Sequence, residues 1–348
     1  MSNFAARRRR LLASVHAAGA LVTDPVDVRY LTGLATSHAA LLIMADRTVL
    51  ATDGRYETAA RRDCPDLELV IARDTVANVA IYIPSGAFIA FDSARTAMQE
   101  FTAMSEWPVW WEPRPDFTAP MRAIKDSDEV EIIAAACAIT AQAMMATFER
   151  VRPGLTERQI AGIFEQQIRE LGADGPSFDT IVATGEHSAI PHHEPGERVL
   201  ERGDFVLIDA GAKLRGYHAD MTRTAVLGTP AAWQRDLHAA VEAAQALGRS
   251  LAVPGASDVD ARVKQAILEA TGGQMPHGTG HGIGLAIHEP PMMASTSPDT
   301  IPAGATMTVE PGMYLPGRGG VRIEDSGHIT GSGYQVLTVA PYDLLELD

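Results

Sequence analysis

Residues 205–226 read FVLIDAGAKLRGYHADMTRTAV, and this stretch decides how the second half of the chain folds. Four apolar residues lead into Asp209, which predicts that this aspartate sits at the buried end of a strand. Gly211 and Gly216 then allow the chain to fold back as a hairpin that carries Asp220. The pattern therefore predicts that two carboxylates meet inside the protein.

Two adjacent carboxylates repel each other unless a proton or a metal ion lies between them. An unpaired buried carboxylate is also costly, so this pair favours a metal ion where further ligands are at hand. The alternative interpretation is that Asp209 caps a turn and that Asp220 pairs with the nearby Arg223.

Two further carboxylates follow short strand-like runs near the carboxyl end. Glu310 ends the run that begins at Met307, directly before a Pro-Gly breaker, and Glu324 ends the run that begins at Val321. Because side chains alternate along a strand, Arg322 faces the same side as Glu324. Arg322 therefore either neutralises Glu324 or contacts a substrate.

Histidines supply the nitrogen donors. Residues 277–288 read HGTGHGIGLAIH and place His277, His281 and His288 among four glycines. Glycine at this density costs a helix about 1 kcal/mol per residue, so a loop or an edge strand is expected. A phosphate-binding loop competes, but it fails because no Lys-Ser or Lys-Thr follows. Elsewhere, the sequence has the pair His192-His193. Histidine pairs of this kind lie on the surface without a catalytic role more often than they are catalytic.

The expected ligands are four carboxylates and one imidazole, with no sulfur. This donor set favours manganese, cobalt or iron over a closed structural zinc site. Four carboxylates balance two divalent ions, which would change the formal net charge from −15 to about −11. Two metal ions about 3.5–4 Å apart hold a hydroxide and polarise a carbonyl, the arrangement used for hydrolysis.

Composition excludes several other classes of protein. The 348 residues hold 29 Lys+Arg against 44 Asp+Glu, and the one basic run, 7–10, is short, so no nucleic-acid partner is expected. Two cysteines exclude a disulfide framework, a thiolate zinc cluster and an iron-sulfur centre. Because no signal peptide and no apolar run of about 18 residues is found, we expect a cytoplasmic protein without a membrane partner.

The chain is expected to form two domains. Four prolines in 107–120 mark a connector that separates an α/β unit, 1–118, from the remainder, 119–348. Strands of the first unit are expected over 39–44, 48–52, 67–72 and 88–91. In the second unit, helices are expected to begin with the N-caps Ser127 and Thr156 and to cover 231–249 and 259–270.

The order of these segments resembles the metallopeptidases with the pita-bread fold, which include methionine aminopeptidase, aminopeptidase P and prolidase. The resemblance covers about 119–348 and is carried by IKDSDE (124–129), SFDTIV (177–182), AIPH (189–192), DFVLIDAG (204–211), GYHADMTRT (216–224), HGTGHGIG (277–284), VEPG (309–312) and VRIED (321–325). Weaker motifs, VRYLTG (28–33) and DGRY (53–56), resemble the family's creatinase-type amino-terminal domain. The resemblance implies a two-domain α/β chain, with a creatinase-like domain at 1–118 and a pita-bread α+β catalytic domain at 119–348.

The resemblance also implies roles for individual residues. Two divalent metal ions are expected, manganese first, with cobalt, zinc and iron as alternatives. Glu310 is expected to handle the nucleophile's proton as well, and Thr222 to orient a metal ligand. The expected metal ligands are Asp209, Asp220, His281, Glu310 and Glu324. The expected substrate groups are His192 and His288, which hold the scissile region and support developing charge, and His277 and Arg322, which line the pocket.

A two-domain layout favours, within this family, enzymes that act on Xaa-Pro bonds. We therefore expect a prolidase, a dimetal hydrolase in which a metal-bridging hydroxide attacks the carbonyl of Xaa-Pro dipeptides. The chain is short for the family, which favours dipeptides, with Arg322 or His277 receiving the free carboxylate. The alternatives are an aminopeptidase P acting on longer Xaa-Pro peptides, or a metal-free relative acting as a binding protein. By analogy, a homodimer is expected.

Overall fold

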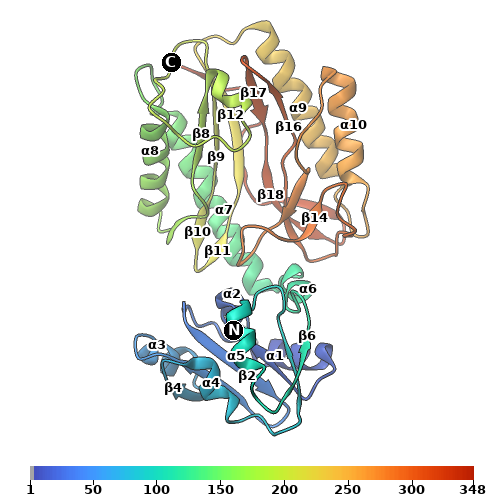
Figure 1. Ribbon diagram of the computed structural model, residues 1–348. Coiled ribbons are helices and arrows are strands. Elements are labelled where there is room, and N and C mark those ends of the chain that lie inside the picture. Colours follow the sequence, from blue (N-terminus) through green and yellow to red (C-terminus); the bar gives the residue numbers. More distant parts are fainter. Residues whose placement is uncertain (1–3) are drawn as a thin grey trace. The chain divides into compact units, whose positions relative to one another are not determined.

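The computed structural model describes residues 4–348, and the chain divides into two compact units, Met1–Arg122 and Ala123–Asp348. Each unit combines strands with helices, so the α/β class expected from the sequence is confirmed. The domain limit between residues 118 and 119 stays a prediction. Figure 1 shows the elements of both units.

The amino-terminal unit is built on a six-stranded mixed sheet with the order β4-β3-β2-β1-β5-β6. Strands β1, β2 and β3 pair antiparallel, whereas β4, β5 and β6 join parallel to their neighbours. The strands are β1 (Gly19–Val22), β2 (Ala39–Met44), β3 (Thr48–Thr52), β4 (Glu68–Ile71), β5 (Phe88–Phe91) and β6 (Trp110–Pro113). The helices are α1 (Phe4–Val15), α2 (Pro25–Thr32), α3 (Glu57–Asp63), α4 (Thr75–Ala80), α5 (Met98–Met104) and α6 (Ala119–Ala123).

Continuous apolar runs form the central strands of this sheet, against which α1, α2 and α4 pack. All but the last residue of β2 are buried, and the core beneath them includes Leu42, Val49, Ile89 and Phe91. The strands expected over 39–44, 48–52 and 88–91 are thus confirmed, and β4 is shorter at both ends than the 67–72 expected.

The carboxyl-terminal unit has two main sheets, with the orders β20-β12-β9-β8 and β14-β13-β15-β18-β19. Helices α7 and α8 pack on the first sheet, and α9 and α10 lie together, with α9 against the second (Figure 1). Its helices are α7 (Ser127–Phe148), α8 (Glu157–Glu170), the short 3-10 helix η1 (Gly185–Ala189), α9 (Ala232–Leu251) and α10 (Val259–Thr271). Its strands are β7 (Gly175–Pro176), β8 (Ile181–Thr184), β9 (Phe205–Ala210), β10 (Ala212–Leu214), β11 (Tyr217–His218), β12 (Met221–Leu227), β13 (Gly280–Gly282), β14 (Glu289–Met293), β15 (Thr306–Val309), β16 (Gly312–Leu315), β17 (Gly319–Arg322), β18 (Asp325–Thr330), β19 (Gly333–Val336) and β20 (Glu346–Leu347).

Helix starts follow capping chemistry, with one difference from expectation. Thr156 caps α8 as expected, and its hydroxyl accepts from the Gln159 backbone N–H. At α7, Asp126 rather than Ser127 is the cap, because the Asp126 carboxylate accepts from the backbone N–H of Glu129 and the Glu129 carboxylate accepts from the backbone N–H of Asp126. Ser127 is the first residue of the helix.

Helix α7 is apolar in composition, although it contains no continuous run of about 18 apolar residues. Among the residues that the structure describes, this helix alone meets the length and composition of a span, with a mean hydropathy of 1.6 over 18 residues. Its isoleucines and alanines supply most of that hydropathy. Ile133, Met144 and Phe148 are buried, and α7 contacts α8, β9, β10 and β12, as a core helix of a folded domain does.

The expected hairpin forms between β9 and β12, which pair antiparallel with Asp209 opposite Thr222. Between these strands the chain makes the short strands β10 and β11 before it returns. Gly211 permits this return, since a Cβ placed there would lie 1.8 Å from the carbonyl oxygen of Ala219. Gly216 adopts φ +80°, which also favours glycine.

Two expected strand boundaries differ from the structure. Strand β17 ends at Arg322, so Glu324 lies just beyond it, and β15 ends at Val309, so Glu310 follows it directly. Strand β13 lies between β14 and β15 and is not an edge strand. Its glycines allow close packing, because a Cβ on Gly280 would lie 2.2 Å from the carbonyl oxygen of Thr308.

Candidate metal centre

One pocket of about 510 Å³ in the carboxyl-terminal unit gathers most of the residues that the sequence singles out. Its volume lies in the range of small-ligand sites. Its wall is partly apolar, with Phe178, Ile181 and Ile287. The expected site residues that line it are His192, Asp209, Asp220, His277, His281, His288, Glu310, Arg322 and Glu324.

Strand ends bring the five expected metal ligands together. Asp209 lies at the end of β9, Asp220 directly precedes β12, and His281 is in the middle of β13. Glu310 and Glu324 follow β15 and β17. The site therefore draws on both main sheets and on the β16–β17 hairpin of the carboxyl-terminal unit.

The centre of the pocket has the spacing of a metal site. Asp220, His281 and Glu324 offer ligand atoms that all lie within 4.8 Å of one another. His281 Nε2 lies 3.6 Å from Asp220 Oδ2 and 3.6 Å from Glu310 Oε1.

Several carboxylate oxygens at this centre lack a hydrogen-bond donor. Within residues 4–348, Asp209 Oδ1, Asp220 Oδ1 and Glu324 Oε1 are buried and have no hydrogen-bond partner. Buried acceptors of this kind are costly unless something pairs with them. Unpaired carboxylate oxygens beside an imidazole fit divalent metal ions.

Electrostatics within the protein alone disfavour this arrangement of charges. Burial, together with the charges of Glu324, Asp209 and Glu310, raises the pKa of Asp220 well above its usual range. Burial raises the pKa of Glu310 to about 8, and burial lowers the pKa of His281 to about 3. The pocket thus concentrates negative charge that a cation would stabilise.

Arg322 is the cation that the protein supplies. Its Nη2 donates to Asp209 Oδ2 at 2.6 Å, and its Nε donates to the hydroxyl of Thr222 at 3.1 Å. Thr222 in turn donates to Glu324 Oε2 at 2.7 Å. Arg322 therefore pairs with Asp209. One interpretation of the sequence had predicted a pairing with Glu324 instead.

Arg223 does not pair with Asp220, which was the alternative interpretation of the hairpin. Its guanidinium pairs with Asp325 at 2.8 Å and donates to the backbone carbonyl of Glu324 at 2.7 Å. Arg223 thus belongs to a buried structural network behind the pocket. Asp220 keeps no basic partner other than His281 among the described residues.

Tyr314 is a site residue that the sequence analysis missed. Its hydroxyl is hydrogen-bonded to His277 Nε2 at 2.8 Å and accepts from Arg322 Nη1 at 2.8 Å. Arg322 Nη1 also donates to the carbonyl of Pro191, so every guanidinium nitrogen of Arg322 is bonded to protein. The signal for Tyr314 was its place in the strand after Glu310-Pro-Gly, close to the expected ligand.

His192 and His288 lie at the pocket wall. The ring of His288 is 4.4 Å from that of His281 between centroids, and burial followed by the charge of His192 lowers the pKa of His288. His192 is exposed on the loop that follows η1. Both residues are placed to contact a ligand in the pocket.

Comparisons with known proteins agree with this geometry. The model of metallopeptidase family M24 matches residues 131–331, and that of the creatinase/prolidase N-terminal domain matches residues 6–108. An uncharacterized peptidase of Bacillus subtilis, YqhT, is 33% identical over 347 residues, which are 97% of this chain and 98% of that protein. The chain therefore belongs to metallopeptidase family M24.

Solved structures give the same result. An Xaa-Pro dipeptidase from Bacillus anthracis superposes with a TM-score of 0.95 at 32% identity, covering 99% of this chain and 100% of that one. An X-Pro aminopeptidase from Thermotoga maritima superposes with a TM-score of 0.91 at 31% identity, covering 98% and 99%. The expected pita-bread fold with a creatinase-type amino-terminal domain is confirmed, and membership in the family implies divalent metal ions.

Proposed function

We propose that this metallopeptidase is a prolidase that cleaves the Xaa-Pro bond of dipeptides. The observation that carries the proposal is the convergence of four carboxylates and one imidazole in a pocket where three carboxylate oxygens lack a partner among the described residues. The names of the relatives support the substrate class, since an Xaa-Pro dipeptidase is among the structures most like this one.

The residues proposed to hold two divalent ions are Asp209, Asp220, His281, Glu310 and Glu324. When bound, such ions lower the pKa of water and polarise a peptide carbonyl. Manganese is proposed because four of the five donors are carboxylates, which suit a hard cation. Thr222 and Arg322 are proposed to fix the orientations of Glu324 and Asp209 through the bonds described above.

Glu310 is proposed to carry the proton of the attacking water. Its side chain is 20% exposed, against 7% for Asp220, so of these two carboxylates Glu310 is the more accessible from the pocket. A carboxylate with such access is able to take a proton from water and return it to the departing proline nitrogen. His288 and His192 are proposed to hold the scissile region and to donate to the developing oxyanion.

The carboxylate of a dipeptide's proline needs a donor in the pocket. Arg322 and His277 both line the pocket, and we propose that one of them receives this carboxylate while its other bonds to protein hold it in place. Binding of that carboxylate is what would favour dipeptides over longer peptides. Because an X-Pro aminopeptidase is among the similar structures, an aminopeptidase P is the second candidate function.

The test compares hydrolysis of Ala-Pro with that of Ala-Pro-Ala in a series of added divalent metals. We expect kcat/KM to be at least tenfold higher for the dipeptide and highest with Mn²⁺. A preference for the tripeptide would support the aminopeptidase instead. If the protein binds no metal ion and cleaves neither peptide, the metal-free binding protein is supported instead.

A homodimer in the cytoplasm completes the proposal. The two cysteines, Cys64 and Cys137, are both buried and free, which suits a reducing compartment. Sedimentation of the metal-loaded protein tests the dimer, and fractionation of the source cells tests the location.

A further inference from the structure

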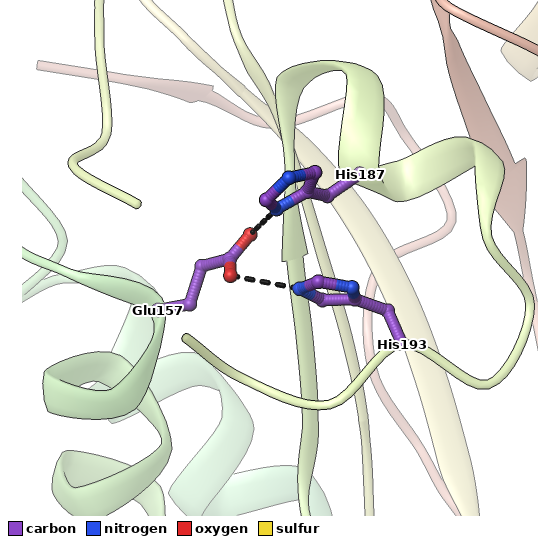
Figure 2. Close-up of side chains that lie close together, drawn as sticks. All are labelled: Glu157, His187 and His193. Atoms are coloured by element: carbon purple, nitrogen blue, oxygen red, sulfur yellow. Dashed lines mark hydrogen bonds and ion pairs between the residues drawn. The ribbon is translucent and has the colours of Figure 1, made fainter. Parts of the chain in front are cut away.

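A second group of side chains that could hold a metal ion takes no part in the proposed hydrolysis. Glu157 is the first residue of α8, His187 lies on η1, and His193 follows on the same loop. Figure 2 shows the two imidazoles directed at the carboxylate of Glu157. Their ligand atoms all lie within 4.8 Å of one another, and the two ring centroids are 4.4 Å apart.

The Glu157 carboxylate does not need both histidines to be satisfied. Its side chain is fully buried, and its Oε1 accepts from the backbone N–H and the hydroxyl of Thr184, both at 2.9 Å. Its Oε2 accepts from the backbone N–H of Gly196 at 3.1 Å. These three bonds already hold the carboxylate in place, so the two imidazoles are additional.

The two histidines nevertheless meet that carboxylate at short range. His187 Nδ1 lies 2.9 Å from Oε1, and His193 Nε2 lies 2.8 Å from Oε2. Burial alone would raise the pKa of Glu157, but hydrogen bonds from His193, Gly196 and Thr184 outweigh it and lower that pKa. The three side chains therefore already lie close enough together for one ion to contact all of them.

We propose that Glu157, His187 and His193 form a separate binding site for one zinc ion. Two imidazole nitrogens and one carboxylate are a zinc-type ligand set, in contrast to the carboxylate-rich centre of the main pocket. The side chains of His187 and His193 are 31% and 13% exposed, which gives an ion access from solvent. This proposal does not depend on the proposed peptidase activity.

A zinc ion at this site would restrain the wall of the main pocket. The ligands His187 and His193 bracket residues 188–192, and Glu157 belongs to a different element, α8. Bound zinc would tie both ends of that segment to α8. Because His192 and His193 both line the main pocket, the ion would hold the part of its wall that carries His192.

The test counts zinc ions per chain by mass spectrometry after the protein is stripped with a chelator and reloaded with Zn²⁺ alone. We expect the wild-type chain to hold one ion more than His187→Ala. Glu186→Gln, a change at an exposed neighbour, is the matched control and should keep the wild-type count. His193→Ala serves as the second variant if His187→Ala fails to fold.

A second measurement follows backbone amide exchange in 185–196. Added zinc should slow exchange there in the wild type and in Glu186→Gln, and not in His187→Ala. Equal zinc counts in wild type and both histidine variants would overturn the proposal and leave the cluster as a hydrogen-bonded clamp. Asp220→Asn separates the two sites: it should lower the count of ions at the main centre and keep the ion that His187 binds.

Discussion

At the scale of single residues, the pocket is held together by one buried arginine that is shared among several acceptors. Arg322 pairs with Asp209 through one carboxylate oxygen, but Asp209, Asp220 and Glu324 each keep one oxygen without a partner among the described residues. The protein therefore supplies part of the positive charge that the site needs, and bound cations would supply the rest. This imbalance gives distinct predictions for the acidic residues and for the histidines.

Asp220→Asn should abolish metal binding and peptidase activity together. Burial and the neighbouring charges of Glu324 and Asp209 raise the pKa of Asp220. Asparagine removes this unfavourable charge, so the metal-free variant should be more stable than the metal-free wild type. A rise in Tm of about 2–4 °C, which corresponds to about 1 kcal/mol, is expected. Thermal unfolding with and without Mn²⁺ measures both effects. A variant that still binds its full complement of metal would contradict the assignment.

His192→Ala should keep the metal ions and lose turnover. The residue is exposed and lines the pocket, so its removal costs little stability. If His192 supports developing charge, kcat should fall by about 10²–10⁴ while metal content stays at the wild-type value. Steady-state kinetics together with metal analysis check this. Unchanged kcat would remove His192 from the mechanism.

His238 on α9 should make the stability of the carboxyl-terminal unit depend on pH. Burial, and then the charge of Arg223, lower the pKa of His238 to about 4 from its ordinary value of 6.5. Because the unfolded chain binds a proton near pH 6.5 and the folded chain does not, stability is complete above that pH and is lost as the pH falls towards 4.

The loss attributable to His238 between pH 7.5 and pH 5 should be about 2 kcal/mol. His238→Gln should remove that part of the pH dependence and leave the rest. Urea unfolding of both proteins at the two pH values measures the difference. Parallel pH curves for the two proteins would show that His238 is not responsible.

At the scale of elements, strands were predictable where an apolar run coincides with a buried strand. Strand β2 and strand β9 have the bounds that their sequences indicate. The proposed acidic ligands were predictable for the same reason, since Asp209 and Glu310 interrupt or follow such runs at strand ends. A carboxylate in that position contradicts the local pattern, and such contradictions mark functional sites.

What the sequence did not reveal depends on contacts between distant segments. Tyr314 meets Arg322 only because β16 pairs with β17, and it meets His277 across 37 positions. The zinc site proposed at Glu157 likewise needs α8 and the η1 loop to come together across 30 positions or more. The pattern of residues within one segment does not encode such long-range contacts. The cap of α7 was missed for a different reason, because the adjacent residues Asp126 and Ser127 are both suitable N-caps.

Gly211→Ala should damage the site through the β9–β12 hairpin, which carries the proposed ligands Asp209 and Asp220. The added Cβ would lie 1.8 Å from the carbonyl oxygen of Ala219, so the backbone must shift between Asp209 and Asp220. We expect a loss of stability of about 1–3 kcal/mol and a clear loss of metal affinity. Chemical unfolding and metal titration measure the two effects.

Gly162→Ala in α8 is the matched control for that change. A Cβ at Gly162 meets nothing within 4 Å, and alanine favours a helix, so the variant should gain up to about 1 kcal/mol. Its metal affinity should equal that of the wild type. If Gly211→Ala behaves like Gly162→Ala, the hairpin tolerates the shift and does not fix the two aspartates.

At the scale of the whole molecule, the candidate metal centre and most of the tryptophans belong to different units. All residues that line the pocket lie in Ala123–Asp348, which contains one of the four tryptophans, Trp233. The other three, Trp107, Trp110 and Trp111, lie in Met1–Arg122. Tryptophan fluorescence therefore reports on each unit separately once the other unit's tryptophans are replaced by phenylalanine.

Added Mn²⁺ should stabilise the carboxyl-terminal unit selectively. An ion that binds only the folded site contributes about 2.7 kcal/mol at a hundredfold excess over its Kd. In the variant that retains Trp233 alone, the urea midpoint should rise with Mn²⁺, and Asp220→Asn should abolish that rise. In Trp233→Phe, the midpoint reported by the other three tryptophans should stay constant, because that unit contributes no ligand to the site. A midpoint that rises equally in both would mean that the two units unfold in one cooperative step, so that the metal stabilises the whole chain.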